Sequence, residues 1–128
     1  MNKSNQSSPA SLQAEAIKKV ALQALEELKA ENIQVIDVRI QASFTDYMIF
    51  ASGKSSRHVK SIAGEVIDAA KLAKMPPLGV EGEDVGEWVL VDLGDVVVHV
   101  MLPDTRLFYD LEKLWGEELV DTGYGTHS

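Results

Sequence analysis

Residues 88–102 read Trp-Val-Leu-Val-Asp-Leu-Gly-Asp-Val-Val-Val-His-Val-Met-Leu, and they carry the strongest short-range structural signal in the chain. Two apolar runs rich in valine flank Gly94-Asp95, and such a dipeptide is typical of a tight hairpin turn. We therefore expect two antiparallel strands, residues 88–93 and 96–102, joined by this turn. This hairpin is the best-defined part of a sheet that the rest of the chain completes.

Alternation along the hairpin divides its side chains between two faces. The wholly aliphatic face is expected to be core, and its members are Val89, Val91, Leu93, Val96, Val98, Val100 and Leu102. The other face is mixed, with Trp88, Leu90, Asp92, Val97, His99 and Met101. If helices cover only the aliphatic face, the mixed face is exposed and resembles a protein interface in composition. If another helix covers it, we expect His99 to bond to Asp92 or to a nearby hydroxyl instead.

Periodicity and capping residues predict the elements on either side of the hairpin. The expected order is a helix from Ser8-Pro9 or Ser11 to Glu31-Asn32, strands at 36–40 and 46–52, a helix from Ser55 or Ser56 to Pro76-Pro77, a short strand at 78–81, the hairpin, and a final helix that Asp104 caps. Strands in runs, with helices before, between and after them, favour an α+β fold: a mixed β-sheet with helices packed on it.

The length of 128 residues corresponds to one domain. We expect residues 1–11 to form a flexible N-terminal tail, residues 12–116 the domain, and residues 117–128 a polar C-terminal tail. The chain contains no cysteine, which excludes disulfides and thiolate zinc ligands. No apolar run is long enough to span a bilayer and the N-terminus lacks a signal-peptide core, so we expect a cytoplasmic protein without membrane contact.

The formal net charge of −8 is distributed unevenly along the chain. Residues 1–75 contain ten basic and eight acidic side chains, whereas residues 76–128 contain two basic and twelve acidic ones. A strongly acidic half disfavours a direct grip on nucleic acid, because phosphate binding depends on Lys and Arg. It favours a basic partner protein, which complementary potentials would attract.

Patterns for metal binding are weak. His58, His99 and His127 lack the spacing of a metal site. Six acidic residues and no basic one lie between Glu81 and Asp95. Clustered carboxylates can bind Mg²⁺ for nucleotidyl transfer, but most of these residues fall in an expected loop and favour a solvated acidic rim. We therefore expect no metal and no cofactor.

The loop Gly53–Arg57 precedes a helix, where backbone N–H groups could hold an anion. It lacks the full phosphate-loop pattern, and no Gly-x-Ser-x-Gly nucleophile motif occurs in the chain. We expect no catalytic residues. The alternative is a nucleotide-binding protein or residual nucleotidyltransferase that uses this loop together with Asp92.

Six motifs follow one another in a characteristic order. They are Asp46-Tyr47, Gly53-x-Ser55-Ser56-Arg57-His58-Val59, Gly79-Val80-Glu81-Gly82, Trp88 to Asp92, Gly94 to Val100, and Phe108-Tyr109-x-Leu111-Glu112-x-Leu114-Trp115. In this order they resemble the Iojap family of ribosomal silencing factors, RsfS in bacteria, over about residues 12–116. The resemblance implies a nucleotidyltransferase-like fold without catalytic residues.

The resemblance also implies a function. Family members bind the large ribosomal subunit through its protein L-fourteen and sterically block joining of the small subunit, which represses translation in starvation or stationary phase. Carried over to this chain, the partner-binding residues are Trp88, Asp92, His99, Met101 and Tyr109, with Glu112 as a charged neighbour. Trp88 and Tyr109 are the expected anchors, because aromatic residues dominate interface energetics. The same face could instead pair two copies in a homodimer.

Overall fold

The computed structural model describes residues 9–120, and its centre is a five-stranded sheet. The strand order is β1 (Glu31–Asp37), β2 (Tyr47–Ser52), β5 (Val96–Met101), β4 (Trp88–Asp92) and β3 (Gly79–Glu81). Strands β2 and β5 are parallel, whereas the other neighbouring pairs are antiparallel. The sheet is therefore mixed, as the sequence predicts.

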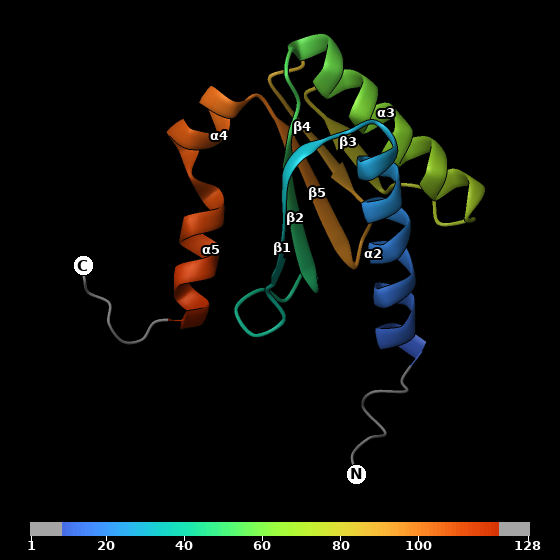
Figure 1. Ribbon diagram of the computed structural model, residues 1–128. Coiled ribbons are helices and arrows are strands. Elements are labelled where there is room, and N and C mark those ends of the chain that lie inside the picture. Colours follow the sequence, from blue (N-terminus) through green and yellow to red (C-terminus); the bar gives the residue numbers. More distant parts are fainter. Residues whose placement is uncertain (1–8, 121–128) are drawn as a thin grey trace.

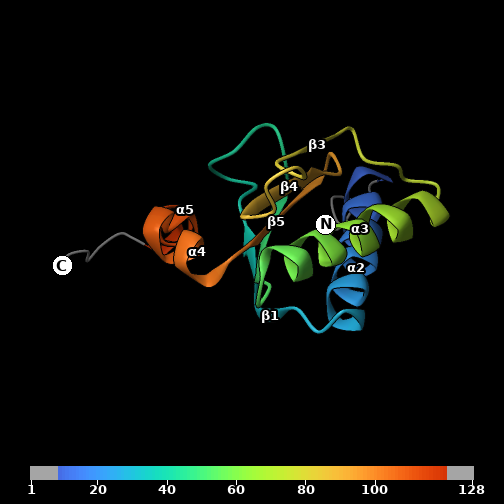
Figure 2. The same ribbon diagram turned by 90° about the horizontal axis from the view of Figure 1, so that it is seen from above.

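Helices cover both faces of this sheet (Figure 1). Helices α2 (Pro9–Glu27) and α3 (Ser56–Leu72) lie on one side, and α4 (Pro103–Tyr109) and α5 (Leu111–Val120) lie on the other. Seen from above, the sheet stands between the two pairs (Figure 2). The α+β fold with helices packed on a mixed sheet is confirmed. None of the helices between residues 9 and 120 has the length and hydrophobicity needed to cross a bilayer.

The main core lies between the sheet and helices α2 and α3. The aliphatic face of the hairpin is buried there as predicted, with Leu102 only partly buried. Helix α3 contributes Val59, Ile62 and Val66, which follow the i, i+3, i+4 pattern and are fully buried. Burial of each such side chain contributes roughly 1.5–3 kcal/mol, so this layer is a major source of stabilisation.

Helix α3 begins where the sequence predicts. The Ser55 side chain accepts a hydrogen bond from the backbone N–H of His58 at 3.1 Å, which makes Ser55 the N-cap. The helix ends at Leu72, before the predicted stop at Pro76-Pro77, and Lys74 follows with a φ of 65°. The sequence therefore located the helix and its start correctly.

The boundary between α2 and β1 differs from the prediction. The helix ends at Glu27 rather than near Glu31-Asn32, because Lys29 turns into the left-handed region with a φ of 60°. The first strand then spans Glu31–Asp37 rather than residues 36–40. The backbone N–H of Arg39 bonds to the Asp37 carboxylate at 3.0 Å, and this local turn ends the strand despite the alternation that continues to residue 40.

The last predicted helix is two helices. Asp110 has a φ of 51° and separates α4 from α5, and its N–H donates to the Arg106 carbonyl at 2.8 Å. The N-cap of α4 is Leu102 with Pro103 following, so the prediction of Asp104 as the cap is wrong. Helix α5 continues to Val120, past Gly116 where the sequence suggested a polar tail. The remaining parts of the expected tails, residues 1–8 and 121–128, lie outside the described residues.

Candidate protein-binding surface

A series of ring contacts leads from the core to the surface on the α4–α5 side of the sheet. Phe50 of β2 stacks on His99 of β5, with ring centroids 4.6 Å apart. Trp88 of β4 lies 6.1 Å from His99 and 5.0 Å from Tyr109 of α4, measured between centroids. Phe108 meets Tyr109 edge-on at 5.0 Å. Such tilted and edge-on pairs are favourable aromatic geometries, so the inner rings hold the outer ones in place.

Trp88 is fixed by a hydrogen bond as well as by packing. Its Nε1–H donates to Nδ1 of His99 at 3.1 Å. A neutral imidazole that accepts at Nδ1 carries its proton on Nε2. Burial lowers the pKa of His99 to about 4, so the ring is neutral at pH 7 and the hydrogen bond persists. Nε2 is buried and has no hydrogen-bond partner.

Two predicted contact residues are covered rather than exposed. His99 is 4% and Met101 is 1% exposed, so the prediction that they present themselves on an open face is wrong. Met101 belongs to a second apolar cluster against which Leu111 and Trp115 of α5 pack. His99 bonds to Trp88, not to Asp92 or a hydroxyl. Both residues support Trp88 from beneath instead of forming the surface.

Asp92 and Glu112 also have partners within the chain. Asp92 lies four residues from Trp88 along β4, or about 13 Å, and its carboxylate accepts the Gly94 N–H at 2.9 Å. Glu112 binds Arg106 through both carboxylate oxygens, at 2.5 Å and 2.9 Å. Of the six predicted residues, the structure brings Trp88 and Tyr109 into contact at the surface.

We define the docking surface as Trp88, Phe108 and Tyr109. Trp88 is half-buried, whereas Phe108 is 79% and Tyr109 is 52% exposed. Leu107 and Leu114 extend the exposed apolar area along α4 and α5. Phe108 was not among the contact residues predicted from the sequence. The signal was present, because three consecutive apolar residues in a seven-residue helix cannot all face the core. Large exposed apolar patches of this kind usually mark an interaction site.

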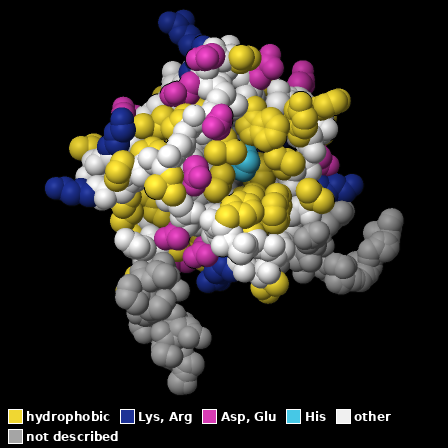
Figure 3. All heavy atoms as spheres, turned by 180° about the vertical axis from the view of Figure 1, so that it is seen from behind, with side chains coloured by type: hydrophobic (Ala, Val, Ile, Leu, Met, Phe, Trp, Pro, Cys, Tyr) yellow, Lys and Arg dark blue, Asp and Glu magenta, His cyan; other side chains and the backbone are white. Residues whose placement is uncertain are grey.

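Phe44 and Trp115 form a second aromatic contact beside α5. Their rings meet edge-on with centroids 6.2 Å apart, and Phe44 is 63% exposed. The Gln41 side-chain amide donates to the Trp115 carbonyl at 3.0 Å, which ties α5 to the loop that follows β1. From behind, hydrophobic side chains gather over the middle of the molecule, with Lys and Arg mostly near its outline (Figure 3).

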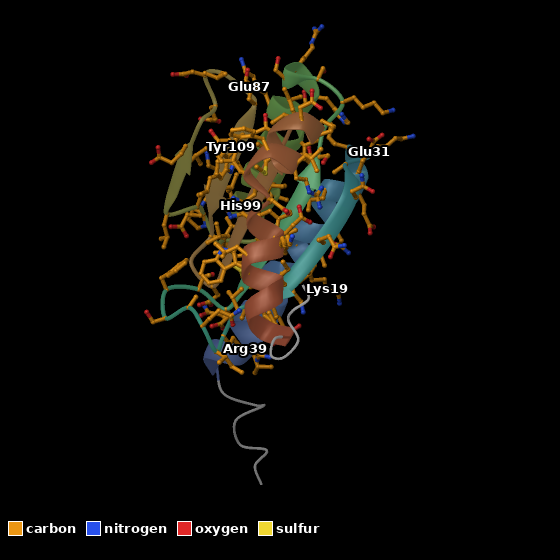
Figure 4. All side chains as sticks on the ribbon, turned by 90° about the vertical axis from the view of Figure 1, so that its left-hand side faces the viewer. Lys19, Glu31, Arg39, Glu87, His99 and Tyr109 are labelled. Carbon is orange, nitrogen blue, oxygen red and sulfur yellow. The ribbon has the colours of Figure 1, made fainter. Side chains whose placement is uncertain are left out.

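Acidic side chains flank the docking surface. Glu81, Glu83, Asp84 and Glu87 are exposed and precede Trp88 in the chain. Glu87 lies at the same end of the molecule as Tyr109 (Figure 4). Its carbonyl accepts the Leu102 N–H at 3.0 Å, so the acidic loop is joined to the segment that leads into α4. The docking surface thus combines exposed aromatic rings with a negative rim.

The residues of the nucleotide-binding alternative are not brought together. Gly53 follows β2 at the end where Trp88 pairs with Met101, whereas Asp92 lies at the opposite end of β4. The Lys54 N–H already donates to Nδ1 of His58 at 2.9 Å, so the loop makes internal bonds. Within the described part of the chain no group of three or more His, Asp and Glu side chains could hold a metal ion. The geometry does not support this alternative.

Comparison with known proteins identifies the family. A family model described as "Ribosomal silencing factor during starvation" matches residues 11–125. The chain belongs to the RsfS family. The RsfS protein of Chromobacterium violaceum is 47% identical over 105 residues, which cover 82% of this chain and 86% of the relative.

A solved structure and a mouse protein with a mitochondrial name are also similar to this chain. A crystal structure of a Chromobacterium violaceum protein matches with a TM-score of 0.79 and 44% identity, covering 89% of this chain and 95% of that one. A mouse protein named "Mitochondrial assembly of ribosomal large subunit protein 1" is 39% identical over 71% of this chain and 41% of its own length. The ordered motifs therefore identified the RsfS family correctly from sequence.

Proposed function

We propose that this chain is a ribosomal silencing factor that binds the large ribosomal subunit and blocks its joining with the small subunit. The partner is ribosomal protein L-fourteen, and the effect is repressed translation during starvation or stationary phase, in the cytoplasm where the ribosomes work. RsfS family membership supports a ribosomal role, and the name of the mouse relative refers to the ribosomal large subunit. The observation that carries the proposal is the docking surface, with aromatic rings held open to solvent.

The geometry of the docking surface suits protein recognition. Tyr109 and Phe108 are more than half exposed, yet their rings are oriented by contacts that lead back to the buried His99 and Phe50. Aromatic anchors of this kind dominate the energetics of protein interfaces, and preorganisation lowers the entropic cost of binding. Because the proposed function requires binding alone, a surface already held in its binding geometry needs no catalytic group.

The charge of the same region favours a basic partner. The exposed acidic residues of the loop before Trp88 lie next to the docking surface, and no Lys or Arg occurs between Glu81 and Asp95. A negative rim steers a positively charged protein into register and repels nucleic-acid phosphates. We infer that the chain reaches the ribosome through a protein and not through a direct grip on its RNA.

The mechanism is steric. A folded domain seated on the face where the two subunits meet excludes the opposite subunit by volume alone. Silencing then requires affinity and position, and it scales with occupancy of the large subunit. This mechanism uses no cofactor, metal or catalytic residue.

Co-sedimentation tests the proposal. The full chain should sediment with purified large subunits and not with assembled ribosomes. The double variant Trp88→Ala/Tyr109→Ala should remain folded and stay in the supernatant, whereas Leu72→Ala, which removes an exposed apolar side chain from α3, should sediment normally. A folded double variant that still sediments with the large subunit at wild-type affinity would place the binding site elsewhere.

The docking surface also supports self-association of the free protein. We propose that two copies can cover their exposed aromatic rings against each other, since an apolar patch without a partner favours burial. Light scattering across a dilution series would show a dimer that dissociates on dilution. If both uses share the docking surface, Tyr109→Ala should weaken the dimer, and added large subunits should dissociate it.

A further inference from the structure

Helix α4 lacks the apolar anchor that normally fixes a helix. Leu107, Phe108 and Tyr109 are all more than half exposed, and Arg106 is the only buried side chain among its seven residues. An amphipathic helix is usually held by an apolar stripe facing the core. Apart from the contact of Tyr109 with Trp88, the attachment of α4 to the fold therefore depends largely on what Arg106 contacts.

Arg106 joins three elements through its guanidinium. Nε and Nη2 donate to the two carboxylate oxygens of Glu112 on α5, at 2.5 Å and 2.9 Å. Nη1 donates to Oγ of Ser52, at the end of β2, at 2.9 Å. The side chains of Arg106 and Glu112 are 10% and 22% exposed. A buried bidentate pair of this kind is directional, so it fixes orientation as well as distance.

The backbone of Arg106 acts at the same corner. Its carbonyl accepts the N–H of Asp110, the left-handed residue that separates α4 from α5. Tyr109, the residue before this turn, then lies with its ring centroid 5.0 Å from that of Trp88. The Arg106 side chain thus attaches the corner to the sheet at the position whose backbone carbonyl closes the turn between the helices.

We propose that Arg106 is the positioning residue of the docking surface, and that Glu112 is its internal counter-ion rather than a contact for the partner. Breaking the pair frees the α4–α5 corner, so that Tyr109 leaves Trp88 and the preformed surface is lost. The inference rests on the proposed function only where binding is measured, because the position of Tyr109 can be observed in the free protein.

The first test observes the free full-length chain by NMR. The wild type should show nuclear Overhauser contacts between the rings of Trp88 and Tyr109, and Arg106→Met should lose them while the core resonances stay dispersed. Arg106→Lys keeps the charge but not the fork geometry, so it should weaken the same contacts. It serves as the test variant if Arg106→Met does not fold. Contacts that persist in the folded Arg106 variants would overturn the proposal.

The second test is a double-mutant cycle on the affinity for purified L-fourteen. Arg106→Met and Glu112→Gln should each weaken binding about tenfold, the loss expected when an aromatic anchor is displaced. Glu112→Gln should add nothing in the Arg106→Met background. An equal further loss in that background would show that Glu112 contacts the partner, and would overturn the proposal.

Arg39→Met supplies the matched control. Arg39 forms the same forked pair with Asp37, with Nε donating to Oδ1 and Nη2 to Oδ2, but both side chains are about half exposed and neither is linked to α4. Its removal should leave both the ring contacts and the affinity unchanged. If wild-type protein does not bind L-fourteen while Arg106→Met loses the ring contacts, the proposed function fails and the positioning role stands.

Discussion

A hydrogen bond between His99 and Trp88 fixes the indole ring at the base of the docking surface. His99 is buried against Phe50 and accepts the indole N–H of Trp88, which leaves the face of the indole for Tyr109. Sequence placed His99 and Trp88 on the same face of the hairpin, because strand alternation is reliable. It left open whether this face is covered, because that depends on how the segments after β5 fold back onto the sheet.

The burial of His99 predicts a pH dependence of stability. The folded state keeps the ring neutral with a pKa of about 4, whereas the unfolded chain takes up a proton near pH 6.5. As the pH falls from about 6.5 to about 4, the unfolded state is stabilised by up to about 1.4 kcal/mol per pH unit. Above this window the contribution is constant.

Urea unfolding at pH 7.0, 5.5 and 4.5 checks this prediction when wild type is compared with His99→Gln. The variant should be less stable at pH 7 but should lose less stability on acidification. Hydrogen bonds to Tyr47 and Arg39 lower the pKa values of Glu15 and Asp37 respectively. Both groups are present in wild type and variant, so their contributions to the pH dependence cancel when the two stability profiles are subtracted. Parallel pH profiles would show that His99 is not protected from protonation.

Gly82 has a backbone role beside the docking surface. Its φ is 86°, and a Cβ built there would lie 2.1 Å from the carbonyl oxygen of Trp88. Gly82→Ala should therefore destabilise the fold by about 2 kcal/mol or more and displace the start of β4. Gly79→Ala, where a Cβ meets nothing within 4 Å, should change the free energy of unfolding by less than about 0.5 kcal/mol in the same chemical denaturation experiment.

At the scale of elements, the hairpin and helix α3 could be predicted because local residues mark the turn of one and the start of the other. Gly94 marks the turn, and Ser55 caps the helix. The end of α2 and the break between α4 and α5 carry no such signal, since the left-handed residues there are Lys29 and Asp110 rather than glycine. The turn at Lys29 is closed by local bonds, in which the N–H of Ala30 donates to the Leu25 carbonyl at 2.9 Å. The corner at Asp110 is attached to the sheet through the link from Arg106 to Ser52.

Helix α3 also contains an internal glycine without a packing role. A Cβ at Gly64 would meet no atom within 4 Å, and the residue lies in regular helix. Gly64→Ala should stabilise the protein by about 0.5–1 kcal/mol, because alanine loses less backbone entropy on folding. A thermal melt should show a higher Tm for the variant. A lower Tm would mean that the close packing of α3 leaves no room for the methyl group.

At the scale of the whole molecule, the sequence separated a nearly neutral first part from a strongly acidic second part. The structure adds that Glu81, Glu83, Asp84 and Glu87 are exposed and shortly precede Trp88, whose ring contacts that of Tyr109. The candidate site could be predicted only in part from the sequence. Trp88 and Tyr109 could be named from the sequence motifs, whereas the intramolecular partners of Glu112 and Met101 depend on how α4 and α5 fold back onto the sheet.

The charge distribution predicts a salt dependence of binding. Raising the NaCl concentration should weaken the complex with the large subunit, because surface charges are screened beyond roughly 8–10 Å at physiological ionic strength. The logarithmic slope should be much shallower than that of a protein gripping many phosphates. Affinities measured by sedimentation or interferometry across a salt series give this slope. A steep slope like that of a nucleic-acid-binding protein would indicate that ribosomal RNA is the main partner.

The most direct measurement is equilibrium binding of the full chain to purified L-fourteen, comparing wild type, Tyr109→Ala and Leu72→Ala. Both substituted side chains are exposed, at 52% and 84%, so neither change should impair folding. We predict that wild type and Leu72→Ala bind equally and that Tyr109→Ala raises Kd by about tenfold or more. Equal affinities for wild type and Tyr109→Ala would contradict the assignment of the docking surface.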